Sequence, residues 1–171
     1  MEYFYKEINS PVGRLKIIAG NIGLAAILWE DDNPDRVRVR TYTENNTHPV
    51  LINTERELME YFEGKRTTFS LALDPIGTEF QKTVWNALST IPYGETRSYR
   101  DIATQIGNVK AVRAVGAANG KNPISIVVPC HRVIGSSGEL TGFAGGLEVK
   151  ARLLSLEGIK NRKTQIELPW Q

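Results

Sequence analysis

The chain has 171 residues, of which 41% are hydrophobic and 23% charged, enough apolar material for one ordinary domain or two small ones. No apolar stretch reaches the roughly 20 residues that a membrane span needs, and the first residues lack the basic and then apolar layout of a signal peptide, so we expect a cytoplasmic protein. One cysteine and two histidines are too few for a structural zinc site, and no glycine-rich phosphate-binding loop is present; we therefore expect neither a metal nor a cofactor.

Charge is distributed unevenly along the chain. Residues 1–77 hold 9 basic and 12 acidic residues, a net charge of −3, whereas residues 78–160 hold 10 basic and 6 acidic residues, a net charge of +4. A basic second half suits a polyanion such as nucleic acid, although a solvated basic surface gives the same count.

The first 77 residues have the pattern of a small α/β domain. Three β-rich segments joined by turn residues predict an antiparallel sheet: residues 3–8, 13–19 and 22–29. Residues 51–62 then carry apolar side chains at helical spacing and predict a helix packed on that sheet. Because no catalytic constellation occurs here, we interpret residues 1–77 as a supporting domain and residues 78–171 as the functional one.

The second domain begins with helix signals. Thr78 and Gln81 form a possible capping box before a helical apolar stripe that ends at Pro92. Ser98 and Asp101 cap a short helix that stops at Gly107, and residues 109–118 predict another. Two short helices joined by a glycine turn are typical of a helix-turn-helix.

The second helix of this pair is rich in alanine and glycine and carries one cation, Arg113. Small side chains let a helix backbone approach its neighbour closely, which suits either a tightly packed core helix or a helix that enters a nucleic-acid groove. An arginine on so slim a helix can reach a base stack or a phosphate, which favours the groove.

Cys130 is the only cysteine and lies in the pentad at residues 129–133, Pro-Cys-His-Arg-Val, after an apolar run at residues 124–128. A lone cysteine is either a small buried hydrophobe or a nucleophile. Pro129 is expected to end a strand built from the apolar run, and the neighbours His131 and Arg132 favour a thiolate. These neighbours favour the nucleophile.

The sequence resembles the O6-alkylguanine-DNA alkyltransferases, the single-turnover repair proteins of methylated DNA. The resemblance is close over residues 78–158 and looser before them. The matching motifs occur in order along the chain: Ser98-Tyr99, residues 111–116, Asn122-Pro123, residues 129–133, residues 136–138, residues 145–147, Lys150 and Glu157.

The resemblance implies a ribonuclease-H-like α/β domain followed by a mainly helical, winged-helix-like domain with a helix-turn-helix. It implies irreversible transfer of the methyl group of O6-methylguanine, and less efficiently of O4-methylthymine, in double-stranded DNA. The DNA would be bound through its minor groove with little sequence specificity, and we expect the protein to be a monomer without a membrane partner.

The family's nucleophilic machinery carries over to three positions. Cys130 would accept the alkyl group, His131 would deprotonate it through a bound water, and Glu157 would orient His131. Neighbouring residues of an extended segment point to opposite sides, which also argues against direct contact between Cys130 and His131. From the residues alone, Glu157 is equally a solvated carboxylate at a helix end.

Further positions match groups that hold the substrate. Tyr99 would donate a proton or hydrogen bond to the purine ring, or else be a packed ring. Asn122 would tie the helix pair to the cysteine segment, and the backbone carbonyls of Cys130 and Val133 would contact the guanine amino group. Lys150 would brace the pocket loop, or be a surface lysine.

The target base must leave the duplex, and by resemblance Arg113, with Ala114 beside it, would fill the vacated stack. Phe143 and Ala144 replace a tyrosine and a serine common in the family, so that only the amide of Ala144 remains to contact the base oxygen. Ser125 stands where some members have proline.

Two other classes of function stay open. A non-catalytic protein that binds alkylated DNA would need the same helix pair, and Cys130 argues against it. A cysteine hydrolase would use Cys130 and His131 over many turnovers, and the lack of a persuasive oxyanion loop disfavours it.

Overall fold

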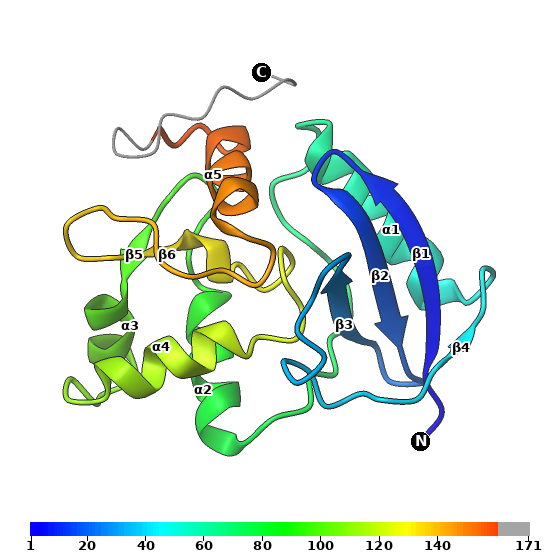
Figure 1. Ribbon diagram of the computed structural model, residues 1–171, viewed down its shortest axis with the longest axis horizontal. Coiled ribbons are helices and arrows are strands. Elements are labelled where there is room, and N and C mark those ends of the chain that lie inside the picture. Colours follow the sequence, from blue (N-terminus) through cyan, green and yellow to red (C-terminus); the bar gives the residue numbers. More distant parts are fainter. Residues whose placement is uncertain (161–171) are drawn as a thin grey trace. The chain divides into compact units, whose positions relative to one another are not determined.

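The structure is a computed structural model that describes residues 1–160 and divides into two compact units (Figure 1). The N-terminal unit consists of Met1–Ile76 together with Pro123–Ser125, and the C-terminal unit contains Gly77–Asn122 and residues 126–160. The sequence indicated a boundary after Gly77 and gave no sign that residues 123–125 belong with the first unit.

The N-terminal unit is built on a four-stranded sheet with the order β3-β2-β1-β4. Strands β1 (Phe4–Ser10), β2 (Gly13–Ala19) and β3 (Leu24–Trp29) are successive antiparallel neighbours, and the short β4 (Thr43–Glu44) runs parallel to β1. The three expected strands are confirmed. The third begins two residues later than expected because residues 20–23 form a turn, closed by a 3.1 Å hydrogen bond from the Gly20 amide to the Gly23 carbonyl.

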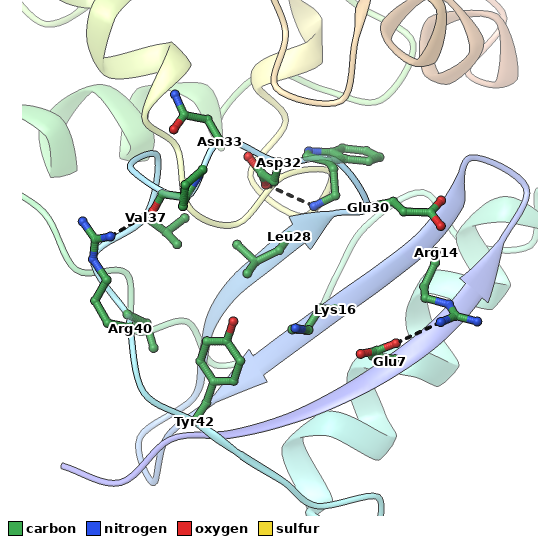
Figure 2. A pocket seen from close by; sticks show the side chains of 13 residues that line it. Glu7, Arg14, Lys16, Leu28, Glu30, Asp32, Asn33, Val37, Arg40 and Tyr42 are labelled. Atoms are coloured by element: carbon green, nitrogen blue, oxygen red, sulfur yellow. Dashed lines mark hydrogen bonds and ion pairs between the residues drawn. The ribbon is translucent and has the colours of Figure 1, made fainter.

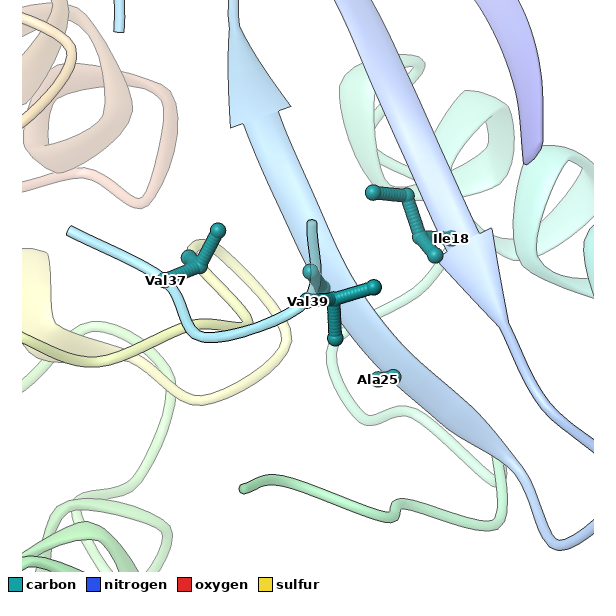
Figure 3. Packing of buried hydrophobic residues seen from close by; sticks show 5 residues of the cluster. Ile18, Ala25, Val37 and Val39 are labelled. Carbon is teal, nitrogen blue, oxygen red and sulfur yellow. The ribbon is translucent and has the colours of Figure 1, made fainter. Parts of the chain in front are cut away.

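Helix α1 (Pro49–Phe62) packs on this sheet, as expected. It begins after His48, whose ring Nδ1 accepts a hydrogen bond from the Val50 amide, and it buries its apolar stripe. A second apolar cluster forms where Val37 and Val39, from the loop after β3, pack with Ile18 and Ala25 of the sheet (Figure 3). The N-terminal unit therefore has an apolar core of its own.

Residues 123–125 join the N-terminal unit beside β3. The Ile27 amide donates a 2.9 Å hydrogen bond to the Pro123 carbonyl, and Trp29 Nε1 donates a 3.2 Å hydrogen bond to the buried hydroxyl of Ser125. The strand expected at residues 124–128 is wrong: only Ile124 forms an isolated bridge, with Ile27. Ile126 has a φ of 74°, in the left-handed region, which ends any extended run there.

The C-terminal unit contains α2 (Glu79–Leu88), α3 (Tyr99–Gln105) and α4 (Val112–Gly120), which pack on one another (Figure 1). Both expected capping boxes are present, Thr78 with Gln81 and Ser98 with Asp101. Helix α4 begins three residues later than expected because the residues before it form a turn, in which the Ala111 amide donates a 3.0 Å hydrogen bond to the Asn108 carbonyl.

Two very short strands complete the unit's framework. β5 (Arg97–Ser98) pairs in parallel with β6 (Val133–Ile134), and α5 (Leu147–Leu156) follows the loop after β6. Within residues 1–160, no helix is both long and apolar enough to cross a membrane.

Candidate active site at Cys130

The pairing of β5 with β6 brings the candidate residues together. Ser98 pairs with Ile134, so Tyr99, the next residue, begins α3 beside the segment that follows Cys130. Cys130 itself is buried and opens a 3-10 turn, Cys130–Arg132. The expected position at the end of a strand is therefore wrong, and so is the argument from extended geometry about how Cys130 and His131 point.

His131, Arg132 and Glu157 form one buried cluster. His131 Nε2 lies 2.7 Å from Glu157 Oε2. Arg132 donates to the same carboxylate through Nε at 2.8 Å to Oε1 and through a terminal nitrogen at 3.1 Å to Oε2. All three side chains are almost fully buried, so Glu157 is not a solvated carboxylate but the centre of an ion-paired network.

The charges in this cluster are set by burial and by its internal hydrogen bonds. Burial works to raise the pKa of Glu157, but the hydrogen bonds from His131 and Arg132, together with the charge of Arg132, outweigh it and lower that pKa to about 2. Burial lowers the pKa of His131, with Arg132 and Lys150 acting in the same direction, against the opposing effect of Glu157. Glu157 is therefore ionised and His131 neutral at pH 7.

This charge state fixes the tautomer of the imidazole. A neutral His131 must donate its Nε2 hydrogen to the Glu157 carboxylate, which leaves Nδ1 as the basic nitrogen. Nδ1 is buried and has no hydrogen-bond partner among residues 1–160. The ring thus presents a proton acceptor in the same turn as the thiol.

The turn before β5 supplies two more groups to the cluster. The Gly94 amide donates a 3.1 Å hydrogen bond to Glu157 Oε1, and the Ile91 carbonyl accepts one from Arg132 at 2.7 Å. Gly94 has a φ of +81°, and a side-chain carbon there would lie 3.3 Å from the Glu157 carbonyl oxygen. Sequence reasoning missed both residues, because a glycine after Pro92-Tyr93 indicates a turn and not a carboxylate ligand.

Lys150 is fully buried, so the alternative of a surface lysine is wrong. Its ammonium donates to the Val133 carbonyl at 2.7 Å and to the Thr141 carbonyl at 3.2 Å. Burial lowers the pKa of Lys150 to about 8, against the opposing effect of nearby Cys130. Lys150 therefore ties β6 to the loop after it and remains largely protonated at pH 7.

Tyr99 is half-buried, and its hydroxyl is hydrogen-bonded to the side-chain hydroxyl of Thr141. Burial raises the pKa of Tyr99, the hydrogen bond with Thr141 lowers it, and Cys130 raises it. Thr141 is a second residue that sequence reasoning missed. It lies 42 residues from Tyr99 in a loop whose sequence indicates only a turn.

Asn122 lies directly before residues 123–125, which belong to the N-terminal unit, and it bonds to a residue that follows them. Its side-chain amide donates a 2.9 Å hydrogen bond to the Val128 carbonyl, and the side chain is buried. The bond fixes the two ends of the segment that leads into Pro129 and Cys130.

The remaining candidates lie outside the hydrogen-bonded cluster. Arg113 and Ala114 are exposed on α4, while Val115 and Ala118 of the same helix are buried. In the loop before α5, Phe143 is half-buried and Ala144 is exposed. The Val133 carbonyl, expected to contact a base, already accepts the Lys150 hydrogen bond and has a second lone pair to offer.

A separate cavity of about 540 Å³ lies in the N-terminal unit against the sheet (Figure 2). An exposed ion pair between Arg14 and Glu7, 3.3 Å apart, stands at one side, and the Asp32 carboxylate accepts a 3.0 Å hydrogen bond from the Trp29 amide. Its lining includes no cysteine, histidine, serine or threonine. Cys130 and the cluster around His131 and Glu157 belong to the C-terminal unit and are not part of this cavity.

Two family models match the chain in succession. Residues 3–75 match the ribonuclease-like domain of 6-O-methylguanine DNA methyltransferase, and residues 79–159 match its DNA-binding domain. This order confirms the expected fold, a ribonuclease-like α/β domain followed by a helical domain with a helix-turn-helix.

Individual relatives agree with the family models. Proteins named methylated-DNA–protein-cysteine methyltransferase are similar over most of their length. That of Methanosarcina acetivorans is 47% identical over 155 residues (91% of this chain, 98% of the relative), and that of Mycolicibacterium paratuberculosis is 50% identical over 153 residues (90% and 91%). The crystal structure of Mycobacterium tuberculosis OGT in complex with DNA superposes with a TM-score of 0.82 at 45% identity, covering 91% of this chain and 93% of that one. Because the two family models match residues 3–75 and 79–159 and these relatives are 47% and 50% identical over about nine-tenths of the chain, the chain belongs to the 6-O-methylguanine DNA methyltransferase family.

Proposed function

We propose that this chain repairs alkylated DNA by direct reversal. It transfers the methyl group of O6-methylguanine, and less efficiently that of O4-methylthymine, irreversibly to the sulfur of Cys130. The observation that carries this proposal is the chain of contacts that begins beside Cys130: neutral His131, hydrogen-bonded at 2.7 Å to ionised Glu157. This is the arrangement of a nucleophile, a base and a group that orients the base.

The reaction is a displacement at carbon. The bond between sulfur and the methyl carbon forms, the bond between that carbon and O6 breaks, and the electron pair leaves with guanine. The thiol proton passes to His131 Nδ1 through a water, and Tyr99 donates a proton to the purine ring as guanine leaves. Solvent then takes the proton from His131 and returns one to Tyr99, so that the net change is the transfer of the thiol proton to guanine. Because a thioether is a poor leaving group and the sequence has no second cysteine, each chain acts once.

The partner is double-stranded DNA, a proposal supported by the M. tuberculosis OGT, which was solved in complex with DNA. The helix pair α3 and α4 approaches the minor groove, where the small residues of α4 permit close contact with little sequence preference. Arg113, with Ala114 beside it, fills the stack when the damaged nucleotide is flipped out, a step that costs a few kcal/mol.

The flipped base is held by the segments around Cys130. The carbonyls of Cys130 and Val133 contact the guanine amino group, the amide of Ala144 contacts the base oxygen, and Phe143 lines the same loop. Lys150 and Asn122 fix the backbone that presents these groups, through the hydrogen bonds at 2.7 and 2.9 Å already described. We further propose that residues 1–77 support residues 78–171, and that the protein acts as a monomer in the cytoplasm.

The test is intact-mass analysis after incubation with a duplex that contains one O6-methylguanine. We expect a gain of one methyl group per chain, mapped to Cys130 and absent in Cys130→Ser. An unmodified protein that still restores the duplex contradicts the proposal, and so does lesion binding without modification. Clearance of a large excess of lesion by little protein would instead indicate a cysteine enzyme with turnover.

A further inference from the structure

Thr141 is joined to the site at two points. Its side-chain hydroxyl is hydrogen-bonded to the hydroxyl of Tyr99, and its backbone carbonyl accepts a 3.2 Å hydrogen bond from the buried ammonium of Lys150. The same ammonium is held by the Val133 carbonyl at 2.7 Å. Thr141 is therefore fixed through its backbone to the segment after Cys130, while its side chain reaches the residue that begins α3.

The direction of the hydrogen bond between the hydroxyls of Thr141 and Tyr99 follows from the proposed role of Tyr99 as a donor to the purine ring. A phenol has one hydrogen, and if Tyr99 gives it to a purine ring, the phenolic oxygen can only accept in other hydrogen bonds. The hydroxyl of Thr141 also has one hydrogen and is within bonding distance of that oxygen. With substrate bound, Thr141 must then be the donor and Tyr99 the acceptor.

A hydrogen-bond donor to the Tyr99 oxygen matters because negative charge develops on that oxygen during the reaction. Burial raises the pKa of the Tyr99 phenol, which weakens it as a proton donor, and the Thr141 hydrogen bond acts in the opposite direction. As the hydrogen of Tyr99 shifts toward the departing guanine, its oxygen becomes more negative. A hydrogen bond to such an oxygen strengthens as the charge grows, and the half-buried position of Tyr99 shields it in part from solvent.

We propose that Thr141 is a positioning residue for the leaving group: its hydroxyl holds the Tyr99 phenol in place and stabilises it while Tyr99 donates to the displaced guanine. This inference rests on the proposed function. In the step itself the sulfur–carbon bond forms, the carbon–O6 bond breaks and the electron pair goes to guanine. Thr141 contributes a hydrogen bond and exchanges no proton.

The test compares Thr141→Val with Thr141→Ser. Valine has nearly the shape of threonine and keeps the backbone carbonyl for Lys150, but it lacks the hydroxyl, whereas serine retains the hydroxyl. With protein in excess over an O6-methylguanine duplex, we expect Thr141→Val to slow methyl transfer about tenfold, the loss of one hydrogen bond in the transition state. Thr141→Ser is expected to stay within about twofold of the unaltered protein. Equal rates for all three proteins would overturn the inference.

Two further measurements separate this role from simple support of the loop. In a Tyr99→Phe background, Thr141→Val is expected to cause no further loss, because the two hydroxyls act as one unit. Alkylation of Cys130 by iodoacetamide releases iodide, which needs no hydrogen bond from Tyr99, so its rate is expected to be the same with Thr141→Val. If iodoacetamide slows as much as methyl transfer, the residue only supports the pocket and the inference is wrong.

Should Thr141→Val unfold, Thr141→Ala removes the same hydroxyl with less bulk and carries the same expectations. The unaltered protein also distinguishes a failure of the inference about Thr141 from a failure of the proposed function. If the unaltered protein transfers methyl to Cys130 and neither hydroxyl-free variant is slower, the inference about Thr141 fails alone. If the unaltered protein transfers nothing, the proposed function itself fails.

Discussion

Glu157 is the residue on which most of the buried charge converges. Its carboxylate accepts hydrogen bonds from His131, from Arg132 and from the Gly94 amide. The sequence places it 26 residues after His131 and gives no local link between them, so only the family resemblance indicated its role. Arg132 was expected to favour a thiolate as a neighbouring cation, whereas the structure directs its guanidinium to Glu157.

Replacing the Glu157 carboxylate tests both its effect on methyl transfer and its contribution to stability. In Glu157→Gln we expect methyl transfer to slow about 100-fold, because the amide no longer fixes the His131 tautomer as an anion does. We expect the free energy of unfolding to fall by about 3 kcal/mol, because Arg132 stays buried without its charge partner. Single-turnover kinetics and urea unfolding measure the two effects. Glu148→Gln, which alters an exposed pair with Arg152, is the matched control and should change neither.

The same residue predicts how stability depends on pH. The pKa of Glu157 is lowered from 4.5 to about 2, so its contribution is fully present above pH 4.5 and is lost as the pH falls toward 2. By linkage this contribution is of the order of 3 kcal/mol. The pKa of His131 is also lowered, so folding loses further stability as the pH falls below 6.5. The stability gap between the unaltered protein and Glu157→Gln should therefore narrow below pH 4.5; a constant gap would contradict this assignment.

At the scale of elements, the helices were predictable and the connections that assemble the site were not. The capping boxes at Thr78 and Ser98 carry their own sequence signals, and both are present. The two-residue strands β5 and β6 carry no such signal, although their pairing places Tyr99 beside the cysteine segment. The apolar run at residues 124–128 misled for a physical reason: buried irregular backbone needs the same side chains as a buried strand.

Because Arg113 is exposed on α4, we expect its replacement to affect a duplex substrate and a free base differently. Arg113→Ala should slow repair of a methylated duplex more than reaction with free O6-methylguanine, since only the duplex leaves a gap in its stack. Lys121→Ala, at the end of the same helix, removes an equal charge and is the control. It should weaken duplex binding slightly and preserve the ratio of the two rates. Equal losses on both substrates with Arg113→Ala would exclude a role in the stack.

At the scale of the whole molecule, three residues from the middle of the C-terminal sequence complete the N-terminal unit. Pro123 accepts a hydrogen bond from strand β3 and Ser125 accepts one from the Trp29 indole, so the sheet edge depends on a segment almost a hundred residues away in the chain. The sequence did not indicate this arrangement; it showed only that Ser125 stands where some family members have proline.

Ser125→Ala should therefore destabilise the N-terminal unit. The change leaves the buried Trp29 Nε1 without its acceptor, which costs about 1–3 kcal/mol. Urea unfolding followed by tryptophan fluorescence measures the loss. Ser136→Ala, at an exposed position, is the control and should unfold as the unaltered protein does. A Ser125→Ala protein as stable as that control would show that the indole bond contributes nothing.

The path of the backbone through residues 123–125 also limits how such proteins can be recombined. A chimera made by exchanging everything before residue 77 would have a foreign tripeptide against its sheet. Any chimera spliced at a single junction would leave at least one of the two units with residues from both parents. Only an exchange that moves the tripeptide along with the amino-terminal portion keeps each packed unit of one ancestry.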